Sequence, residues 1–459
     1  MRALDDTICA VATPPGEGGI AIVRVSGPRA LEVARGLLRN ADGSGVSLEP
    51  RYATFVKVVN PRNNRILDEA IAILMVAPRS YTREDVLEIQ CHGGRAAANA
   101  ILDAVLSMDV RLAEPGEFTL RAFLRGRIDL IQAEAVADII HAETAESLKI
   151  HERLLQKKLS EEVGEWQRKL GDALVHLESY LDFPEEELEL QGARELTDSL
   201  KVAASRMREK LGSYSWGRTA RDGFRVAILG LPNVGKSSLL NALAEEERAI
   251  VSPIAGTTRD TIEIKINALG APIHLVDTAG LRVSSDEIES EGVSRARRAA
   301  NEADLLLMVF DGSRELAPEE RDEARLLAER GSFLAVVNKT DLGDHAANAV
   351  EEILGIQPLK ISAKSREGIE LLLGALRERA WSGEGPTTED PLTRLRHRNQ
   401  VSAALERVEL GISLLESTDY ADAAANELQA ARRELASLLG WGTPEEIVDR
   451  IFEEFCIGK

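Results

Sequence analysis

The segment "GLPNVGKSS", residues 230–238, constrains the fold more than any other part of the sequence. It follows the apolar run "FRVAI" and opens a helical run, "SLLNALAEE". Gly230, Gly235, Lys236 and Ser237 have the spacing of a phosphate-binding loop. Glycines let backbone N–H groups turn toward a phosphate, and the helix N-terminus adds positive potential. The segment predicts a strand, a phosphate loop and a helix of an α/β sheet. The alternative is a glycine-rich turn that only packs a strand against a helix.

Strands and helices alternate across residues 224–364, which predicts a doubly wound sheet. Mostly apolar strands separated by helical stretches are typical of a largely parallel sheet with helices on both faces. The predicted strands lie in "FRVAILG", "TIEIKINALG", "PIHLVDTAG", "ADLLLMVFDGS", "FLAVVNKTD" and "PLKISAK".

Three further motifs follow the phosphate loop in order and speak against the packing-only alternative. In "DTAG", Asp277 can hold Mg²⁺ through water, and the Gly280 amide can sense a γ-phosphate. In "NKTD", Asp341 can accept hydrogen bonds from both the ring N–H and the exocyclic amine of guanine. Adenine lacks that donor pair, so the motifs predict a GTP site closed by "SAK". The candidate nucleotide-binding residues are Gly230, Asn233, Val234, Gly235, Lys236, Ser237, Ser238, Asp277, Thr278, Ala279, Gly280, Asn338, Lys339, Asp341, Ser362, Ala363 and Lys364.

The hydrolytic group is not evident from these motifs. Leu281 stands where many small GTPases carry a glutamine that positions water, and an apolar side chain cannot do this. Upstream, "SPIAGTTRD" offers Thr258 to Mg²⁺ and a set of backbone carbonyls beside Asn233. Oxygen ligands suit a hard cation, which could replace an arginine finger near the phosphates. The alternative fits the residues equally well: Asn233 is then an ordinary loop residue, and "SPIAGTTRD" is an ordinary switch segment.

The flanks of the α/β region predict two other domains. Short β-rich runs and turns up to about Arg121 indicate an α+β domain, and helical periodicity begins near Leu130. After the linker "SGEGPTTEDP", helical periodicity returns from Thr393. We interpret this as one helical domain with the G domain inserted, in preference to two separate helical pieces. The predicted ranges are 1–121 (α+β), 122–217 (helical, first part), 218–383 (G domain) and 384–459 (helical, second part).

Composition indicates a cytoplasmic protein without a membrane segment. The formal net charge of −20 argues against a protein that coats nucleic acid through a general basic field. Only local basic patches remain as candidates for RNA contact, in "RAFLRGR" (Arg121, Arg125, Arg127) and "TRLRHRNQ" (Arg394, Arg396, His397, Arg398). Solvated helix faces explain them equally well. Cys9, Cys91 and Cys456 have no paired or metal-like spacing.

The C-terminal segment "GTPEEIVDRIFEEFCIGK" predicts a helix that presents Cys456 at a defined place. Thr443 is expected as the N-cap, Pro444 as the first helical residue and Glu446 as the capping-box partner. Ile447, Ile451, Phe452 and Phe455 are expected to form its apolar face. By composition alone the cysteine is incidental.

Several segments together carry a resemblance to a known family. These are "ATPPGEGGIAIVRVSG", "SYTREDVLEIQCHGG", "PGEFTLRAFLRGRIDLIQAEAV", "YLDFPEEE", "PNVGKSS", "GTTRD", "DTAGLR" and the terminal "CIGK". The whole chain resembles the MnmE (TrmE) family of GTPases that modify tRNA. The resemblance implies three parts: an α+β tetrahydrofolate-binding-like domain, an α-helical domain, and an inserted Ras-like α/β G domain with a phosphate-binding loop.

The resemblance also implies an activity and its partners. The family forms a homodimer and works with an FAD-containing partner, MnmG (GidA), in a heterotetramer or larger complex. Together they add an aminomethyl or carboxymethylaminomethyl group to C5 of the wobble uridine of certain tRNAs. The one-carbon unit comes from a tetrahydrofolate derivative, 5-formyl- or methylene-tetrahydrofolate. GTP hydrolysis in the family depends on K⁺ and on association of two G domains.

Residue roles follow from the same resemblance. Asn233, Ser252, Ile254 and Thr257 fall on the K⁺ positions, Ser237 and Thr258 on the Mg²⁺ positions, and Glu289 on the glutamate that activates water. Arg24, Glu88 and Lys459 fall on folate contacts, and Arg127 falls where the family often has lysine. Cys456 is then expected to meet the substrate uridine or support its activation.

Two other functions compete with this interpretation. A regulatory or ribosome-assembly GTPase without one-carbon chemistry predicts an RNA-binding module or a second G domain, and the sequence contains neither. A folate-dependent transferase with a vestigial G domain conflicts with the intact nucleotide motifs.

Overall fold

The structure is a computed structural model that describes residues 5–182, 190–246, 263–277, 301–328, 332–381, 390–417 and 421–459. The chain forms two compact units. The first comprises Met1–Ala137, Leu154–Gly164 and Leu435–Lys459, and the second comprises Asp138–Arg153 and Glu165–Glu434. The domain limits expected at residues 121, 217 and 383 stay predictions.

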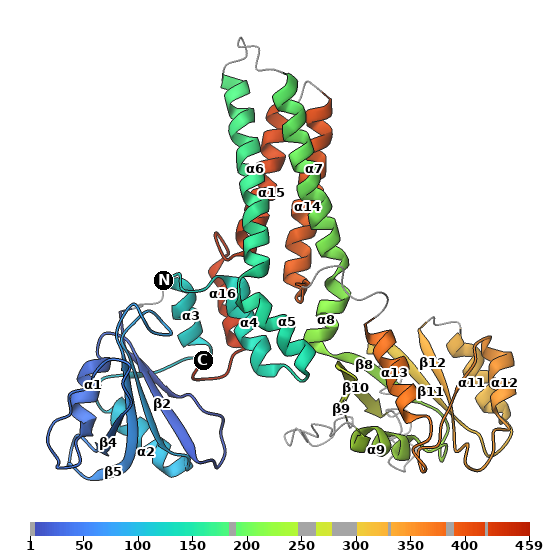
Figure 1. The fold of residues 1–459 in the computed structure, drawn as a ribbon, viewed down its shortest axis with the longest axis horizontal. Helices are drawn as coiled ribbons and strands as arrows, with labels where there is room; N and C mark the ends of the chain where they lie inside the picture. Colours follow the sequence, from blue (N-terminus) through green and yellow to red (C-terminus); the bar gives the residue numbers. More distant parts are fainter. Residues whose placement is uncertain are drawn as a thin grey trace, which may run out of the picture. The chain divides into compact units, whose positions relative to one another are not determined.

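The first unit contains a seven-stranded sheet in the order β3-β4-β5-β6-β2-β1-β7. Figure 1 labels β2, β4 and β5 of this sheet. Its strands are β1 (Ile8–Val11), β2 (Ile20–Ser26), β3 (Leu38–Arg39), β4 (Thr54–Val59), β5 (Ile66–Met75), β6 (Val86–His92) and β7 (Arg111–Leu112). Apolar residues of β2 and β6 alternate inward and pack with α1 (Ala30–Leu37) and α2 (Arg95–Leu106). The predicted α+β character of this region is confirmed.

A second core in the first unit holds the C-terminal segment against the sheet domain. It joins α3 (Glu117–Leu124), the start of α4 (Leu130–His141) and α16 (Glu445–Glu453). Val448, Ile451, Phe452 and Phe455 supply the buried side chains of the C-terminal segment. Ile447, expected on this apolar face, is 44% exposed, so that part of the prediction is wrong.

The capping expected at α16 is also wrong. Pro444 is the N-cap residue itself, at φ −54° and ψ 141°, and no side chain caps the helix. The Thr443 hydroxyl donates instead to the Ser437 carbonyl, at 3.0 Å. The hydroxyl therefore bonds to the last turn of α15 and not to the first turn of α16, and sequence spacing alone does not show which of these it prefers.

The second unit contains a helical part whose segments lie before and after the α/β strands in sequence. Its helices, some of which begin or end in the first unit, are α5 (Ala145–Leu155), α6 (Lys158–Asp182), α7 (Leu190–Gly212), α8 (Tyr214–Asp222), α14 (Leu395–Glu416) and α15 (Ala421–Leu438). Helices α7 and α14 pack side by side (Figure 1), with an ion pair of 2.8 Å between Lys201 and Glu416. One helical domain interrupted by an insertion is therefore confirmed. Among the described residues, no helix has the length and apolar character needed to cross a bilayer.

The inserted part is a doubly wound sheet in the order β13-β12-β11-β8-β10-β9. Its strands are β8 (Phe224–Leu229), β9 (Glu263–Ala268), β10 (Ala271–Asp277), β11 (Leu305–Asp311), β12 (Phe333–Asn338) and β13 (Leu359–Lys360). Only β9 is antiparallel to its neighbour. Its helices are α9 (Lys236–Glu246), α11 (Pro318–Ala328), α12 (Ala347–Leu354) and α13 (Ile369–Ala380).

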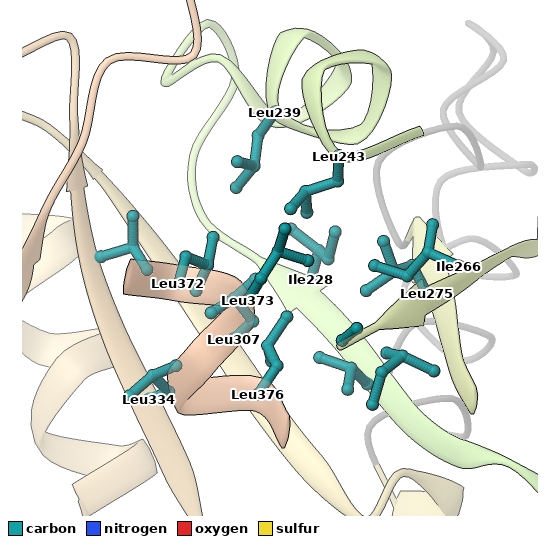
Figure 2. Close-up of a cluster of buried hydrophobic side chains, with 14 of the residues drawn as sticks. Ile228, Leu239, Leu243, Ile266, Leu275, Leu307, Leu334, Leu372, Leu373 and Leu376 are labelled. Carbon is teal, nitrogen blue, oxygen red and sulfur yellow. The ribbon is translucent and has the colours of Figure 1, made fainter. Parts of the chain in front are cut away.

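Helices cover both faces of this sheet, as the sequence predicts. Figure 2 shows one face, where Leu239 and Leu243 of α9 and Leu373 of α13 pack on the strands. On the other face, α11 and α12 pack on the alternate side chains of the same strands. The carboxyl ends of the parallel strands therefore share one edge, where ligands bind in sheets of this kind.

The two proposed basic patches are only partly exposed, because Arg127 and Arg398 lie at the surface while three of the other five residues are buried. Arg121 is 0% exposed and contacts carboxylates of Asp6, Glu84 and Glu117. Arg394 is 7% exposed and bonds to Asp138, and His397 is 1% exposed. These three buried residues are neither an RNA surface nor a solvated helix face, and the sequence does not show the carboxylates that pair with the two arginines. RNA contact through the exposed arginines of the two patches stays a prediction.

Candidate functional site

The phosphate loop lies between β8 and α9, as predicted. Gly230 and Gly235 have φ of +140° and +97°, a region that side chains rarely adopt. A Cβ at Gly230 would lie 2.4 Å from the Val309 carbonyl oxygen, and one at Gly235 would lie 2.3 Å from Asn338 Nδ2. The loop therefore needs glycine at both positions, and its backbone is open to an anion at the start of an 11-residue helix.

Lys236 spans this loop. The residue is 6% exposed, and its Nζ donates to the carbonyl oxygens of Gly230 and Leu231, at 2.8 and 2.7 Å. The cation is thus held over the loop, where a triphosphate would place its anionic oxygens. The loop, the cation and the helix N-terminus together fit a nucleoside triphosphate with Mg²⁺, for which the exposed Ser237 offers a hydroxyl.

The "NKTD" residues bind the phosphate loop directly. Asn338 is 1% exposed; its Nδ2 donates to the Val234 carbonyl at 3.0 Å, and its Oδ1 accepts from the Ala363 amide at 3.0 Å. Asn338 therefore connects three predicted motifs. The Ser362 hydroxyl donates to Asp341 at 2.7 Å, which orients the carboxylate expected to read guanine.

Lys339 makes the second connection, and its partner Asp311 was missed from the sequence. Lys339 Nζ donates to the Asn233 carbonyl at 2.6 Å and to Asp311 Oδ2 at 2.7 Å. Burial raises the pKa of Asp311, but hydrogen bonds from Lys339 and Ser313 outweigh it, so the pKa lies below its ordinary value. The sequence does contain a signal for Asp311, because the residue ends an apolar run. In the structure this run is the fully buried strand β11, which pairs with the strand that ends in "NKTD".

Several predicted residues lie outside the described part of the chain. These are Ser252, Ile254, Thr257, Thr258, Thr278, Ala279, Gly280 and Glu289. Asp277 is the last residue of β10, at the same sheet edge as the phosphate loop.

The predicted folate contacts form a second cluster, in the first unit. Arg24 of β2 lies opposite Glu88 of β6, and Arg24 Nε donates to Glu88 Oε1 at 2.9 Å. The Arg24 guanidinium also lies 5.7 Å from the Tyr81 ring centroid and 5.6 Å from that of Phe118. Tyr81 and Phe118 are site residues that the sequence analysis missed, since neither belongs to a chemical motif.

The C-terminal "CIGK" segment reaches this cluster. Arg24 Nη1 donates to the Gly458 carbonyl at 3.2 Å, and the Phe118 amide donates to the Lys459 carbonyl at 3.1 Å. Gly458 has φ +98°, and a Cβ there would lie 2.6 Å from the Val11 carbonyl oxygen. Burial, followed by the positive charge of Arg24, lowers the pKa of Lys459. Cys456 is exposed beside this anchored turn.

Arg127 joins the same cluster through Tyr81. Its guanidinium lies 4.6 Å from the Tyr81 ring centroid, and its Nη1 donates to the Tyr81 carbonyl at 3.0 Å. A guanidinium pair, a carboxylate, an ammonium and two aromatic rings fit a ligand with a polar heteroaromatic ring and carboxylates, as a folate is.

Comparison with known proteins places the chain in a family. Residues 7–127 match the model of the GTP-binding protein TrmE N-terminus, and residues 130–456 match the MnmE helical domain. The chain is 42% identical over 460 residues to the tRNA modification GTPase MnmE of Geobacter metallireducens, covering 99% of this chain and 100% of the relative. The chain belongs to the MnmE family.

A second relative matches the chain over its whole length, and a solved structure matches only part of it. The tRNA modification GTPase MnmE of Carboxydothermus hydrogenoformans is 41% identical over 464 residues, covering 99% of this chain and 100% of the relative. The solved FeoB G-domain of Methanococcus jannaschii is 26% identical and covers 34% of this chain and 97% of that chain, with a TM-score of 0.26. Membership of the MnmE family agrees with the three-part fold predicted from the sequence.

Proposed function

We propose that the protein is a K⁺-dependent GTPase that acts with an FAD-containing MnmG (GidA) partner to modify C5 of the wobble uridine in certain tRNAs. One observation carries the proposal. A phosphate loop braced by a guanine motif lies in a chain that is 42% identical, over 99% of its length, to a tRNA modification GTPase. The regulatory GTPase without one-carbon chemistry remains the alternative.

In the G domain, Lys236 binds the β- and γ-phosphates, and Asp341 reads guanine. Ser237 and Thr258 hold Mg²⁺, and Asp277 holds it through water. Mg²⁺ held by these residues would neutralise charge that develops on the phosphates. Asn233, Ser252, Ile254 and Thr257 hold K⁺, and Glu289 orients the attacking water. The Lys339 bond to the Asn233 carbonyl supports this assignment, because it fixes the loop that carries Asn233.

In the first unit, Arg24, Glu88, Arg127 and Lys459 bind a tetrahydrofolate derivative, the source of the one-carbon unit. Cys456 meets the uridine or supports its activation, and a thiolate is the reactive form of any cysteine. The hydrogen bond from Arg24 to Gly458 supports both roles, because it joins the folate cluster to the segment that carries the thiol. We propose that the protein acts as a homodimer, in a heterotetramer or larger complex with MnmG.

Nucleoside analysis of tRNA tests the proposal. Cells lacking this gene should lose the wobble-uridine side chain, as measured by mass spectrometry of digested tRNA. Wild type should restore it and Cys456→Ser should not. Ile457→Ala is the matched control, because Ile457 adjoins the thiol in the same exposed tail and is 53% exposed. An unchanged nucleoside profile in the deletion would favour the regulatory GTPase, and restoration by Cys456→Ser would remove the thiol from the chemistry.

The nucleotide roles have a separate test in the purified protein. GTP hydrolysis should be faster in KCl than in NaCl of equal ionic strength, and Glu289→Ala should abolish most of it. Asp341→Asn should shift the preference from GTP toward xanthosine triphosphate, because xanthine carries a carbonyl where guanine carries the exocyclic amine. Equal rates in both salts would remove K⁺ from the proposal and leave the guanine site intact.

A further inference from the structure

An open cavity of about 590 Å³ lies in the first unit, beside the folate cluster. Four of its lining residues are arginines, Arg51, Arg79, Arg83 and Arg127, and Tyr81 also lines it. The volume lies within the range of about 300–1,000 Å³ that is usual for small-molecule sites. Four cations in one cavity require an explanation in a chain with a net charge of −20.

Among the residues that the structure describes, these arginines have no carboxylate partner. The bonds that three of them make go to carbonyl oxygens: Arg51 to that of Arg79 at 2.7 Å, Arg83 to that of Arg125 at 2.8 Å, and Arg127 to that of Tyr81 at 3.0 Å. A carbonyl accepts a hydrogen bond but leaves the positive charge in place. Buried Arg121, which has three carboxylate partners, shows that this fold neutralises arginines elsewhere.

Two of the four arginines have a backbone conformation that is energetically unfavourable for a residue with a side chain. Arg51 and Arg83 have φ of +65° and +61°, the left-handed region that favours glycine. Strained backbone of this kind gathers at binding sites, where the rest of the structure holds it. Arg51 lies just before β4, and Arg83 lies in the segment between β5 and β6 that also carries Arg79 and Tyr81.

Tyr81 connects the cavity to the folate cluster. Its ring centroid lies 5.7 Å from the Arg24 guanidinium and 4.6 Å from that of Arg127. Ile73 and Met75 add apolar lining next to the arginines. A ligand that extends from Arg24 past Tyr81 therefore enters a cavity that offers both apolar side chains and cations.

We propose that this cavity binds the γ-linked polyglutamate tail of the folate, a proposal that rests on the folate site of the proposed function. The aminobenzoyl ring of the ligand packs against Tyr81, Ile73 and Met75, and successive α-carboxylates pair with the arginines. RNA phosphates share the negative charge but not the need for a hollow with an apolar wall. The cavity therefore favours the small-molecule polyanion.

Equilibrium dialysis of the full-length protein with 5-formyltetrahydrofolate tests the tail site, with mono- and triglutamate forms compared. Two more arginine–carboxylate pairs near the surface should tighten binding of the triglutamate roughly fivefold. The gain should shrink as NaCl is raised. The double variant Arg51→Gln/Arg79→Gln should bring the ratio of the two affinities close to one. The matched control is Arg65→Gln, because Arg65 is an exposed arginine just before β5 and outside the cavity. Circular dichroism verifies the fold of each variant.

The outcomes separate the tail site from the proposed function. Equal affinities for both forms in wild type would overturn the tail site and leave the folate cluster standing. Absence of binding of either form would overturn both. A double variant that keeps the wild-type ratio but loses affinity for tRNA would assign the cavity to RNA instead. Loss of the ratio in the double variant, with the ratio retained in Arg65→Gln, supports the proposal.

Discussion

Asn338 is the residue on which the geometry of the nucleotide site depends most. It is buried and bonds to both the phosphate loop and the segment expected to close over the base, each at 3.0 Å. Asn338→Ala leaves the Val234 carbonyl and the Ala363 amide without this partner, at about 1–3 kcal/mol for each buried group. We therefore expect GDP affinity to fall by more than tenfold and the loss to be visible in fluorescent-nucleotide titrations.

The control for this substitution is Asn348→Ala, on the exposed face of α12 in the same domain. It should leave both GDP affinity and thermal unfolding close to wild type. If Asn338→Ala bound GDP as tightly as wild type, the bracing bonds would not position the loop, and the site would be held by the strands alone.

Residues also show where sequence analysis reaches its limit. The nucleotide motifs were predictable because each motif is local in sequence and its chemistry depends on spacing. Tyr81 and Arg121 were not, because their roles come from partners far along the chain. Arg121 bonds to Asp6, which is 115 positions away, and a charge pattern cannot reveal such a partner.

At the scale of elements, Asp138 of α4 joins four helical segments of the second unit. Its carboxylate accepts from Arg221 of α8 at 3.2 Å and from Arg394, the N-cap of α14, at 2.7 Å. His151 of α5 lies 3.7 Å from the same carboxylate. Helices before and after the inserted domain thus share one buried carboxylate, which explains how a helical domain interrupted in sequence closes in space.

The burial of His151 in this cluster predicts a pH dependence. Burial lowers the pKa of His151 to about 4; Asp138 opposes the shift, and Arg394 and Arg221 add to it. The unfolded chain binds a proton near pH 6.5 and the folded chain only near pH 4, so stability falls as the pH decreases between these values. The free energy of unfolding should fall by about 3 kcal/mol in all, and at least half of this decrease should have occurred by about pH 5.

Urea unfolding followed by circular dichroism, at about pH 7 and about pH 5, measures this effect. His151→Gln should lower stability at neutral pH but reduce the difference between the two pH values. His176→Gln, which changes an exposed histidine of α6, should keep the wild-type difference. A wild-type difference that persists in His151→Gln would assign the pH dependence to other groups.

Helices and strands were predicted well where a periodic apolar pattern extends over many residues, and less well at their ends. The stripe through Leu159, Val163, Trp166 and Leu170 is buried on α6 as expected, because many side chains agree on one face. The predicted cap of α16 was wrong because the Thr443 hydroxyl donates to the Ser437 carbonyl and does not accept from an amide of the first turn. Short strands such as β3 and β7 have two residues each and leave no periodic signal.

At the scale of the molecule, one ion-pair cluster ties the inserted G domain to the helical part of the second unit. Glu143, between α4 and α5, accepts from Lys265 of β9 at 2.5 Å and from His274 of β10 at 2.9 Å. The hairpin of β9 and β10 joins the "SPIAGTTRD" segment to Asp277, the two parts of the chain proposed to sense the nucleotide. The helical part therefore holds the strand pair between them.

The charge of Glu143 makes this connection testable. Burial raises the pKa of Glu143, but hydrogen bonds from His274 and Lys265 outweigh it and lower the pKa to about 2. Its contribution is present above the ordinary value of 4.5 and is lost as the pH falls toward 2. Glu143→Gln should lower the free energy of local opening of the hairpin by about 1–3 kcal/mol at neutral pH, because the amide has no charge and only one of the two acceptor oxygens.

Hydrogen exchange of the β9–β10 amides, measured by mass spectrometry, reports that opening. Exchange should accelerate roughly fivefold or more in Glu143→Gln, with β11 and β12 unchanged, since local opening free energy sets the exchange rate. Glu146→Gln is the control, because that exposed side chain of α5 makes only a long pair with Lys149, at 3.9 Å. Unchanged exchange in Glu143→Gln would mean that the hairpin is held by its own sheet. Acceleration confined to the hairpin would mean that the helical part stabilises the strand pair between the two nucleotide-sensing segments.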